Sequence, residues 1–321
     1  MDARRSSGRR RSPMSTRGVV VAIAVVALAA AGCSSDGTSG EAATPSPAKV
    51  TSAQGPPGSS AVSEQNRVRL VNLGDSFASG TGTGPLVEDS PIYCQRSSKN
   101  FAHIVAAEEG YDLTDVSCAG ADTADFRGSQ QEGIPPQLDA LDENVDVVTL
   151  MIGGNDKKTY GRAIELCGEV AATDLTGSPC TDKYGKSLID PVEKDIYPAV
   201  RQALRDVKAE APNAEILLAG YPWLLPPTIG CYPEMRIADG DVAMIRDLQT
   251  ALTTYGRRAA QETGARFVDM SQESEGHDAC AGDQRWIEPM TTPGPGAVHP
   301  NERGQEAIAE QVRKALAMTP N

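Results

Sequence analysis

One stretch of seven residues constrains the fold more than any other part of the chain. Residues 146–152 (DVVTLMI) are apolar at almost every position. A strand with one face in water alternates polar and apolar residues, whereas a strand covered on both faces is apolar throughout. Four further short apolar runs of β type occur in the chain. They cover residues 68–73, 113–117, 215–219 and 266–270.

Helix-like stretches lie between and after these strands, at residues 99–109, 190–210, 239–262 and 302–317. Alternation of this kind predicts right-handed crossovers and a parallel sheet with helices on both faces. We therefore expect an α/β fold with three layers and a five-stranded parallel sheet. The chain shows no internal repeat and no second linker, so residues 66–321 are predicted to form one domain.

Two long stretches, residues 157–189 and 271–299, lack clear periodicity. Each contains cysteines. We predict that both are surface loops held by disulfides.

The first 33 residues have the composition of an export signal. Six arginines precede an apolar run from Val19 to Ala31, which is shorter than the roughly 20 residues that span a bilayer. The run ends in Gly32-Cys33 and resembles the lipobox of bacterial lipoproteins, with Ala30 in the place usually taken by Leu. We expect residues 1–33 to be a signal peptide with lipidation at Cys33; an ordinary secretory cleavage site is the alternative.

Residues 34–65 are rich in Ser, Thr, Gly, Pro and Ala and contain almost no large apolar side chain. Such a segment cannot bury enough surface to offset its ordering entropy, which predicts a flexible tether. The expected location is extracytoplasmic, either as a cell-membrane lipoprotein or secreted. The protein is expected to be a monomer that contacts the membrane only through its N-terminal lipid.

The charge of the chain bears on its partners. The formal net charge is −13, and residues 1–32 carry +5, which leaves −18 on the remainder. Binding to nucleic acid phosphates needs clustered Lys and Arg. An acidic surface therefore argues against a nucleic acid partner.

The cysteine count supports an oxidising compartment. Of seven cysteines, six remain when Cys33 is set aside, and an even number is consistent with three disulfides. No two of them have the short spacing of a zinc site. Six cysteines allow fifteen pairings, and the residues alone do not select one.

Polar and glycine-rich segments follow three of the expected strands and precede the last helix. In open parallel sheets, ligands bind beyond the carboxyl ends of the strands, so these segments are expected to meet at one edge. They are Gly74-Asp75-Ser76, Cys118-Ala119-Gly120, Gly153-Gly154-Asn155-Asp156 and His299-Pro300-Asn301.

Ser76 is the candidate nucleophile, at a tight turn from strand to helix. A serine hydroxyl needs an adjacent base. Of the three histidines, His103 lies in an apolar helix-like stretch, whereas His299 lies in a Gly- and Pro-rich loop and is free to face the cleft. The alternative for Gly-Asp-Ser is a simple helix cap. A neutral His299 predicts a rate that falls on the acid side, near the ordinary imidazole pKa of about 6.5.

Attack on a carbonyl creates an oxyanion, which needs hydrogen-bond donors fixed in advance. The natural donors are the backbone N–H groups of Ser76 and Gly120 and the side-chain amide of Asn155. Each segment alone is a weak signal, with a turn as its alternative. Their order and their common place at strand ends favour a catalytic set.

These segments resemble those of the SGNH, or GDSL-type, hydrolases, and the resemblance covers nearly all of residues 67–310. It implies a flavodoxin-like sandwich in which Ser76, Gly120, Asn155 and His299 take the four signature roles. The chain is most similar to a branch of secreted bacterial esterases with three disulfides, through residues 94–97, 117–121 and 277–280. That branch implies the pairs Cys94–Cys118, Cys167–Cys180 and Cys231–Cys280.

Many members of this family carry an Asp three residues before the histidine, but position 296 is Gly here. The similar branch also lacks that acid, and there a backbone carbonyl orients the imidazole. We therefore expect a Ser76–His299 dyad with the carbonyl of Gly296 as the hydrogen-bond acceptor. An acid from elsewhere, Asp278 first, is the alternative.

The resulting hypothesis is an exported serine esterase or lipase that acts on lipid or fatty-acyl esters and needs no metal or organic cofactor. Residues 221–226 are candidates to line an acyl pocket, with loop packing as the alternative. Three other functions compete with this one. They are a carbohydrate O-acetyl esterase of the same fold, a non-catalytic surface binding lipoprotein and a metal hydrolase built on His277 and Asp278.

Overall fold

The computed structural model describes residues 67–318. The predicted signal peptide, Cys33 and the tether at 34–65 lie outside these residues. Five strands form one sheet in the order β2-β1-β3-β4-β5, and every neighbouring pair is parallel. The strands are β1 (Arg69–Gly74), β2 (Asp112–Asp115), β3 (Val147–Met151), β4 (Glu215–Ala219) and β5 (Arg266–Val268).

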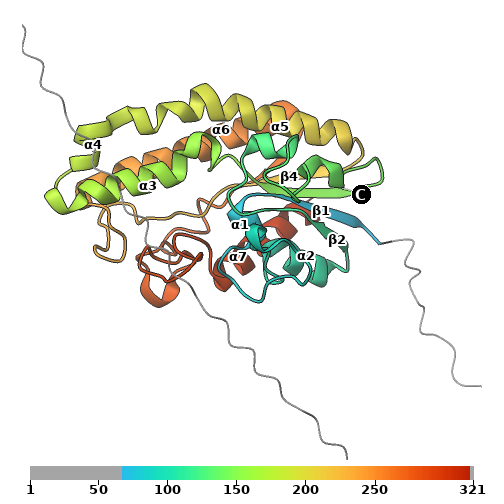
Figure 1. Cartoon of the computed structure of the whole chain (residues 1–321), viewed down its shortest axis with the longest axis horizontal. Coiled ribbons are helices and arrows are strands. Elements are labelled where there is room, and N and C mark those ends of the chain that lie inside the picture. Colours follow the sequence, from blue (N-terminus) through green and yellow to red (C-terminus); the bar gives the residue numbers. More distant parts are fainter. Residues whose placement is uncertain (1–66, 319–321) are drawn as a thin grey trace, which may run out of the picture. The chain divides into compact units, whose positions relative to one another are not determined.

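Helices cover both faces of this sheet. Figure 1 shows α2 and α7 on one side of the sheet and α5 and α6 on the other. Every residue of β3 is buried. The predicted three-layer α/β fold is therefore confirmed. The helices are α1 (Ser76–Ser79), α2 (Phe101–Glu109), α3 (Thr159–Val170), α4 (Pro179–Tyr184), α5 (Tyr197–Glu210), α6 (Val242–Thr263) and α7 (Glu302–Ala317).

The order of the strands determines where a crevice opens at the edge of the sheet. β1 has β2 on one side and β3 on the other, so the chain reverses its direction of winding at β1. At such a switch point the loops that leave the two neighbouring strands diverge and open a crevice at the carboxyl edge. The loops after β1 and β3 carry Ser76 and Asn155.

One prediction about the loops was wrong and one is confirmed. Residues 157–189 are largely helical, since they contain α3 and α4. The buried face of α3 includes Tyr160, Ala163, Ile164 and Cys167, which have helical spacing, but two glycines and several charged residues obscure the pattern in the sequence. Residues 271–299 are irregular apart from a short 3-10 turn.

Three disulfides join the loops, and they are the pairs that the resemblance implies. Cys94 pairs with Cys118, which lies two residues before Gly120. Cys167–Cys180 joins α3 to α4, and Cys231–Cys280 joins the loop after β4 to the irregular segment 271–299. Between residues 67 and 318, no helix combines the length and the apolar content that crossing a bilayer requires.

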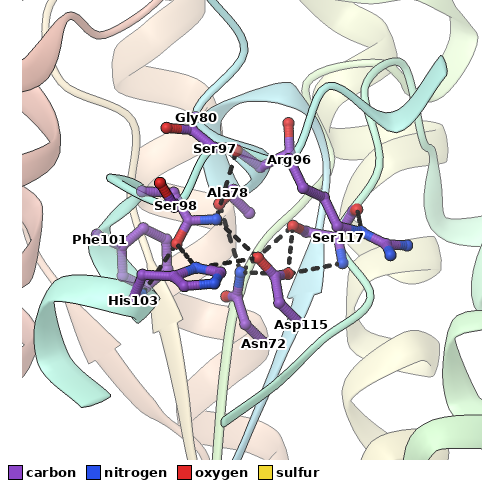
Figure 2. Close-up of polar contacts among 12 residues, drawn as sticks. Asn72, Ala78, Gly80, Arg96, Ser97, Ser98, Phe101, His103, Asp115 and Ser117 are labelled. Carbon is purple, nitrogen blue, oxygen red and sulfur yellow. Dashed lines mark hydrogen bonds and ion pairs between the residues drawn. The ribbon is translucent and has the colours of Figure 1, made fainter. Parts of the chain in front are cut away.

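A buried polar network lies beneath α1 and is centred on Asp115, at the end of β2 (Figure 2). Its carboxylate accepts hydrogen bonds from Asn72 Nδ2 at 3.0 Å, Asn100 Nδ2 at 2.7 Å and Ser117 Oγ at 2.6 Å. These three partners are completely buried. Asn72 also reaches the Ala78 carbonyl, so the network connects β1 and β2 to the helix that carries Ser76.

His103 lies beside this network, as predicted for a packed helix residue. Its Nδ1 is 3.1 Å from Asn100 Oδ1 and 3.6 Å from Asp115 Oδ2. Burial lowers the pKa of His103, and the charge of Asp115 partly opposes that effect. A neutral imidazole is therefore favoured here.

We expect Asp115→Ala to lower the free energy of unfolding by roughly 2–4 kcal/mol, because it removes the acceptor that three buried side chains share. Urea unfolding of the oxidised protein measures this value. The matched control is Asp112→Ala, an exposed position on the same strand, with an expected change within about 0.5 kcal/mol. Equal effects of the two substitutions would contradict a structural role for the network.

Candidate active site

Ser76 is placed by a backbone contact that only glycine allows. Gly74 ends β1 with φ +121°, and a Cβ at this position would lie 2.2 Å from the Met151 carbonyl oxygen of β3. Asp75 then caps α1, since its Oδ1 accepts the Phe77 N–H at 2.9 Å. This turn puts Ser76 in the first turn of α1, where the side chain is mostly buried.

His299 contacts Ser76 directly. The distance from His299 Nε2 to Ser76 Oγ is 2.8 Å, although the residues are 223 positions apart. Two backbone hydrogen bonds to Glu288 hold the loop around His299. The Val298 N–H donates to the Glu288 carbonyl, and the Glu288 N–H donates to the His299 carbonyl. The left-handed φ of Val298, +62°, turns the chain between these two bonds.

The carbonyl that faces the imidazole differs from the predicted one. His299 Nδ1 is 2.8 Å from the carbonyl oxygen of Ala297, and not from that of Gly296. The Gly296 carbonyl instead accepts the backbone N–H of His299 at 3.1 Å, so a turn already occupies it. Gly296 also lies directly against Gly82, where a Cβ would be 2.2 Å from the Gly296 Cα.

No carboxylate hydrogen bonds to this imidazole within residues 67–318. The alternative acid, Asp278, accepts the Cys280 N–H at 2.9 Å instead. A carbonyl only accepts hydrogen bonds, so Nδ1 carries the proton and Nε2 is left as an acceptor for the Ser76 hydroxyl. The site therefore holds a serine–histidine pair with a backbone orienting group.

Burial lowers the pKa of His299 below its ordinary value, and the Ala297 carbonyl partly opposes this by stabilising the imidazolium. The sequence led us to expect an ordinary imidazole pKa. The difference arises from the loop and from Phe77, whose ring centroid lies 5.3 Å from that of His299. These groups remove water that would otherwise solvate the cation.

Asn155 lies in the same pocket as Ser76 and His299. Its Nδ2 donates to the Ala121 carbonyl at 3.0 Å, which fixes the amide plane and leaves the second N–H of that group available. Gly120 precedes Ala121 directly, has φ +78° and is not among the lining residues of the pocket. In the part of the chain that the structure describes, the backbone N–H groups of Ser76 and Gly120 have no protein acceptor.

Gln130 is a neighbour that the sequence analysis missed. Its Nε2 donates to the Ala119 carbonyl at 2.8 Å, and that carbonyl shares a peptide group with the Gly120 N–H. Because the peptide is planar, a fixed oxygen also fixes the direction of the N–H on the opposite side. No feature of the local sequence marks Gln130 for this contact.

The pocket beside Ser76 has a volume of about 380 Å³. Its walls are mostly apolar or aromatic and come from α1, α3, the loop after β4 and the loop before α7. Of the predicted lining residues 221–226, Tyr221 lines the pocket, but Trp223 and Leu224 lie in the core. Glu165 and Arg236 are charged residues in the lining. The apolar or aromatic lining residues are Phe77, Tyr160, Ile164, Tyr221, Met290, Ala297 and Val298.

Two buried carboxyl groups flank the site. Burial raises the pKa of Asp75 to about 7, although hydrogen bonds from Tyr221 and Phe77 oppose the rise. Burial also raises the pKa of Asp156 to about 6, against hydrogen bonds from Thr123. Among residues 67–318, no cationic side chain is a hydrogen-bond partner of either carboxyl, and their partners there are neutral donors.

The residues proposed for a metal hydrolase are engaged elsewhere. His277 stacks on Trp286 with ring centroids 4.2 Å apart, and its Nδ1 is 2.7 Å from the Gln284 carbonyl oxygen. Asp278 caps the turn before Cys280. Within residues 67–318, no three His, Cys, Asp or Glu residues are grouped so as to hold a metal ion.

The fold is a parallel sheet between two layers of helices, and Ser76 and His299 are hydrogen bonded beyond its carboxyl edge. Residues 73–307 match the GDSL-like Lipase/Acylhydrolase family, and the chain belongs to that family. It is a carboxylic ester hydrolase of the SGNH type.

The chain is similar to characterised proteins over most of its length. It is 44% identical to Lipase 2 of Streptomyces coelicolor, covering 77% of this chain and 85% of that protein. It is 27% identical to an esterase of Streptomyces scabiei, covering 80% and 88%.

Two solved structures share the fold. Phospholipase A1 from Streptomyces albidoflavus has a TM-score of 0.67 at 24% identity, covering 78% of this chain and 99% of that one. The extracellular lipase from Streptomyces rimosus has a TM-score of 0.65 at 24% identity, covering 77% and 99%.

We expect the imidazole of His299 in the folded protein to titrate below about pH 6.5, because burial disfavours its cationic form. NMR titration of the histidine ring signals measures this pKa, and the signal that disappears in His299→Asn assigns it. In urea, where the protein is unfolded, the pKa obtained from the same signal is expected to be about 6.5. A folded-state pKa equal to or above the unfolded one would show that the loop does not exclude water from the ring.

Proposed function

We propose that this protein is an exported serine esterase that cleaves acyl esters of lipids through an acyl-enzyme on Ser76, with His299 as the general base. The observation that carries the proposal is the 2.8 Å contact between His299 Nε2 and Ser76 Oγ, with Nδ1 held by the Ala297 carbonyl. This arrangement puts an unprotonated nitrogen beside the hydroxyl that must lose its proton.

In the proposed reaction, Ser76 Oγ attacks the ester carbonyl while His299 Nε2 takes its proton. The developing oxyanion accepts hydrogen bonds from the backbone N–H groups of Ser76 and Gly120 and from Asn155 Nδ2. The tetrahedral intermediate collapses, and the imidazolium protonates the leaving alcohol. Water then hydrolyses the acyl-enzyme by the same steps.

The pocket supports a fatty-acyl substrate. Its walls are mostly apolar or aromatic, and its volume of about 380 Å³ accepts more than an acetyl group. The relatives named as lipases and a phospholipase share the family or the fold and agree with this substrate class. The charged side chains of Glu165 and Arg236 also line the pocket, and they are the groups that a sugar O-acetyl esterase would use to bind the hydroxyls of the sugar.

Export is supported by two features of the chain and by one relative. The first 33 residues have the pattern of a signal peptide, and three disulfides form in an oxidising compartment. The lipase from Streptomyces rimosus is described as extracellular. Lipidation of Cys33, the tether at 34–65 and the monomeric state belong to the same proposal.

We expect the purified protein to hydrolyse p-nitrophenyl esters and Ser76→Ala to lower the rate by at least about 10³-fold, because it removes the nucleophile. Initial rates on a series from acetate to palmitate measure this and give the preferred chain length. The matched control is Ser187→Ala, whose exposed hydroxyl donates to the Tyr184 carbonyl. A folded wild-type protein inactive on every ester would favour the binding lipoprotein, and a preference for acetate would favour a deacetylase.

We expect Asn155→Ala to lower kcat by roughly 10²–10³-fold and to change KM by less than about threefold. The amide is expected to bind the oxyanion of the transition state more strongly than the neutral ester. Steady-state kinetics on the preferred ester separate the two constants, with Asn213→Ala as an exposed control. A rise in KM at unchanged kcat would assign Asn155 to ground-state binding and refute the oxyanion role.

A further inference from the structure

The hydroxyl of Tyr221 lies between the two loops that carry Ser76 and Asn155. Tyr221 follows β4, and its Oη is 2.5 Å from Asp75 Oδ2 and 3.0 Å from the backbone nitrogen of Gly154. Asp75 immediately precedes the nucleophile, and Gly154 immediately precedes Asn155. One side chain from the loop after β4 therefore connects the loops that follow β1 and β3.

The direction of both hydrogen bonds follows from their chemistry. The Gly154 N–H can only donate, so the Tyr221 oxygen accepts there. The single proton of the hydroxyl is then free to be donated to the carboxylate of Asp75. Phenylalanine can form neither bond, although its ring has the same shape.

The hydroxyl has little freedom to move. The Phe77 ring packs edge-on against Tyr221, with centroids 5.1 Å apart. A Cβ added to Gly154 would lie 3.0 Å from Tyr221 Oη, so glycine lets the loop approach this closely. The loop that carries Asn155 therefore contacts the Tyr221 hydroxyl directly.

Asp75 depends on this contact. The carboxyl is 1% exposed, and within residues 67–318 Tyr221 is its only side-chain hydrogen-bond partner. Its other oxygen holds the Phe77 N–H at the start of α1. The Tyr221 hydroxyl therefore connects the Asn155 turn to the turn of Asp75, which the Phe77 N–H holds independently.

We propose that Tyr221 is a positioning residue that holds the Asn155 loop in register with Ser76, so that the Asn155 amide meets the oxyanion formed at Ser76. The inference rests on the proposed serine-esterase function. Tyr221 acts through Asn155, because its hydroxyl accepts the N–H of Gly154, the residue immediately before Asn155. The Ala121 contact of Asn155 fixes the far end of the amide, and Tyr221 fixes the near end of the loop.

The test is a double-mutant cycle of Tyr221→Phe and Asn155→Ala on the preferred p-nitrophenyl ester. In the wild-type background, Tyr221→Phe is expected to lower kcat by about 10–100-fold and to change KM by less than about threefold. In the Asn155→Ala background, the same substitution is expected to lower kcat by less than about threefold, because the group that it positions is gone.

The matched control is Tyr197→Phe. The Tyr197 hydroxyl also donates to a carboxylate, Glu262 Oε2 at 2.7 Å, but this pair joins α5 to α6. Its loss is expected to change kcat by less than about twofold in both backgrounds. A general effect of removing a buried tyrosine hydroxyl would appear in both variants.

Values of kcat are expressed per Ser76 that reacts with a fluorophosphonate, so unfolded molecules do not count. If Tyr221→Phe does not fold, Asp75→Asn replaces it. Asparagine has nearly the same shape as aspartate, but it offers the Tyr221 hydroxyl an uncharged amide in place of the carboxyl group. The expected loss in kcat is then about 3–10-fold, again confined to the background that retains Asn155.

Unchanged kcat in the substituted protein, or equal losses with and without Asn155, would overturn the inference. A wild-type protein that hydrolyses no ester would instead refute the proposed function. The two failures are distinguishable, because the first requires Ser76-dependent activity in the wild type.

Discussion

The contact between Ser76 and His299 depends on a buried amide that ties the last helix to the first. Gln305 of α7 is completely buried, and its Nε2 donates to the Phe77 carbonyl while its Oε1 accepts the Phe101 N–H. α7 is thereby held against α1 and α2, and the loop before it delivers His299 to the nucleophile. Gln137 pairs in the same way with both backbone groups of Gly74. An amide suits these places because it donates and accepts at once, whereas an apolar side chain would leave buried backbone groups unpaired.

Much of the fold could be predicted because burial on both faces leaves a direct mark on the sequence. The apolar run that became β3 and the amphipathic pattern of α7 indicated their elements with nearly the right bounds. α3 was missed for the opposite reason. Gly161 and Gly168 lower its helix propensity, and packing against neighbouring segments stabilises it instead. Tertiary contacts that override local preference are not visible in a single sequence.

The site divides in a similar way. Ser76, Asn155 and His299 could be placed in one pocket because parallel strands end at the same edge of a sheet, which is a rule of topology. The orienting carbonyl could not be chosen correctly, because the direction of a peptide group depends on backbone dihedrals such as the left-handed φ of Val298. The Tyr221 bridge was missed for a related reason, since it joins three loops whose relative positions follow only from the folded structure.

The backbone acceptor at His299 has a consequence for the proposed chemistry. A carboxylate at Nδ1 would stabilise the imidazolium and raise the pKa of the base, whereas a carbonyl does so more weakly, and burial here lowers that pKa. The base therefore stays neutral to lower pH but has less driving force to take the proton of Ser76. With a weaker base, stabilisation of the oxyanion must account for a larger part of the lowering of the activation barrier. The expected oxyanion donors are fixed by hydrogen bonds, through the Ala121 contact of Asn155 and the Gln130 contact beside Gly120.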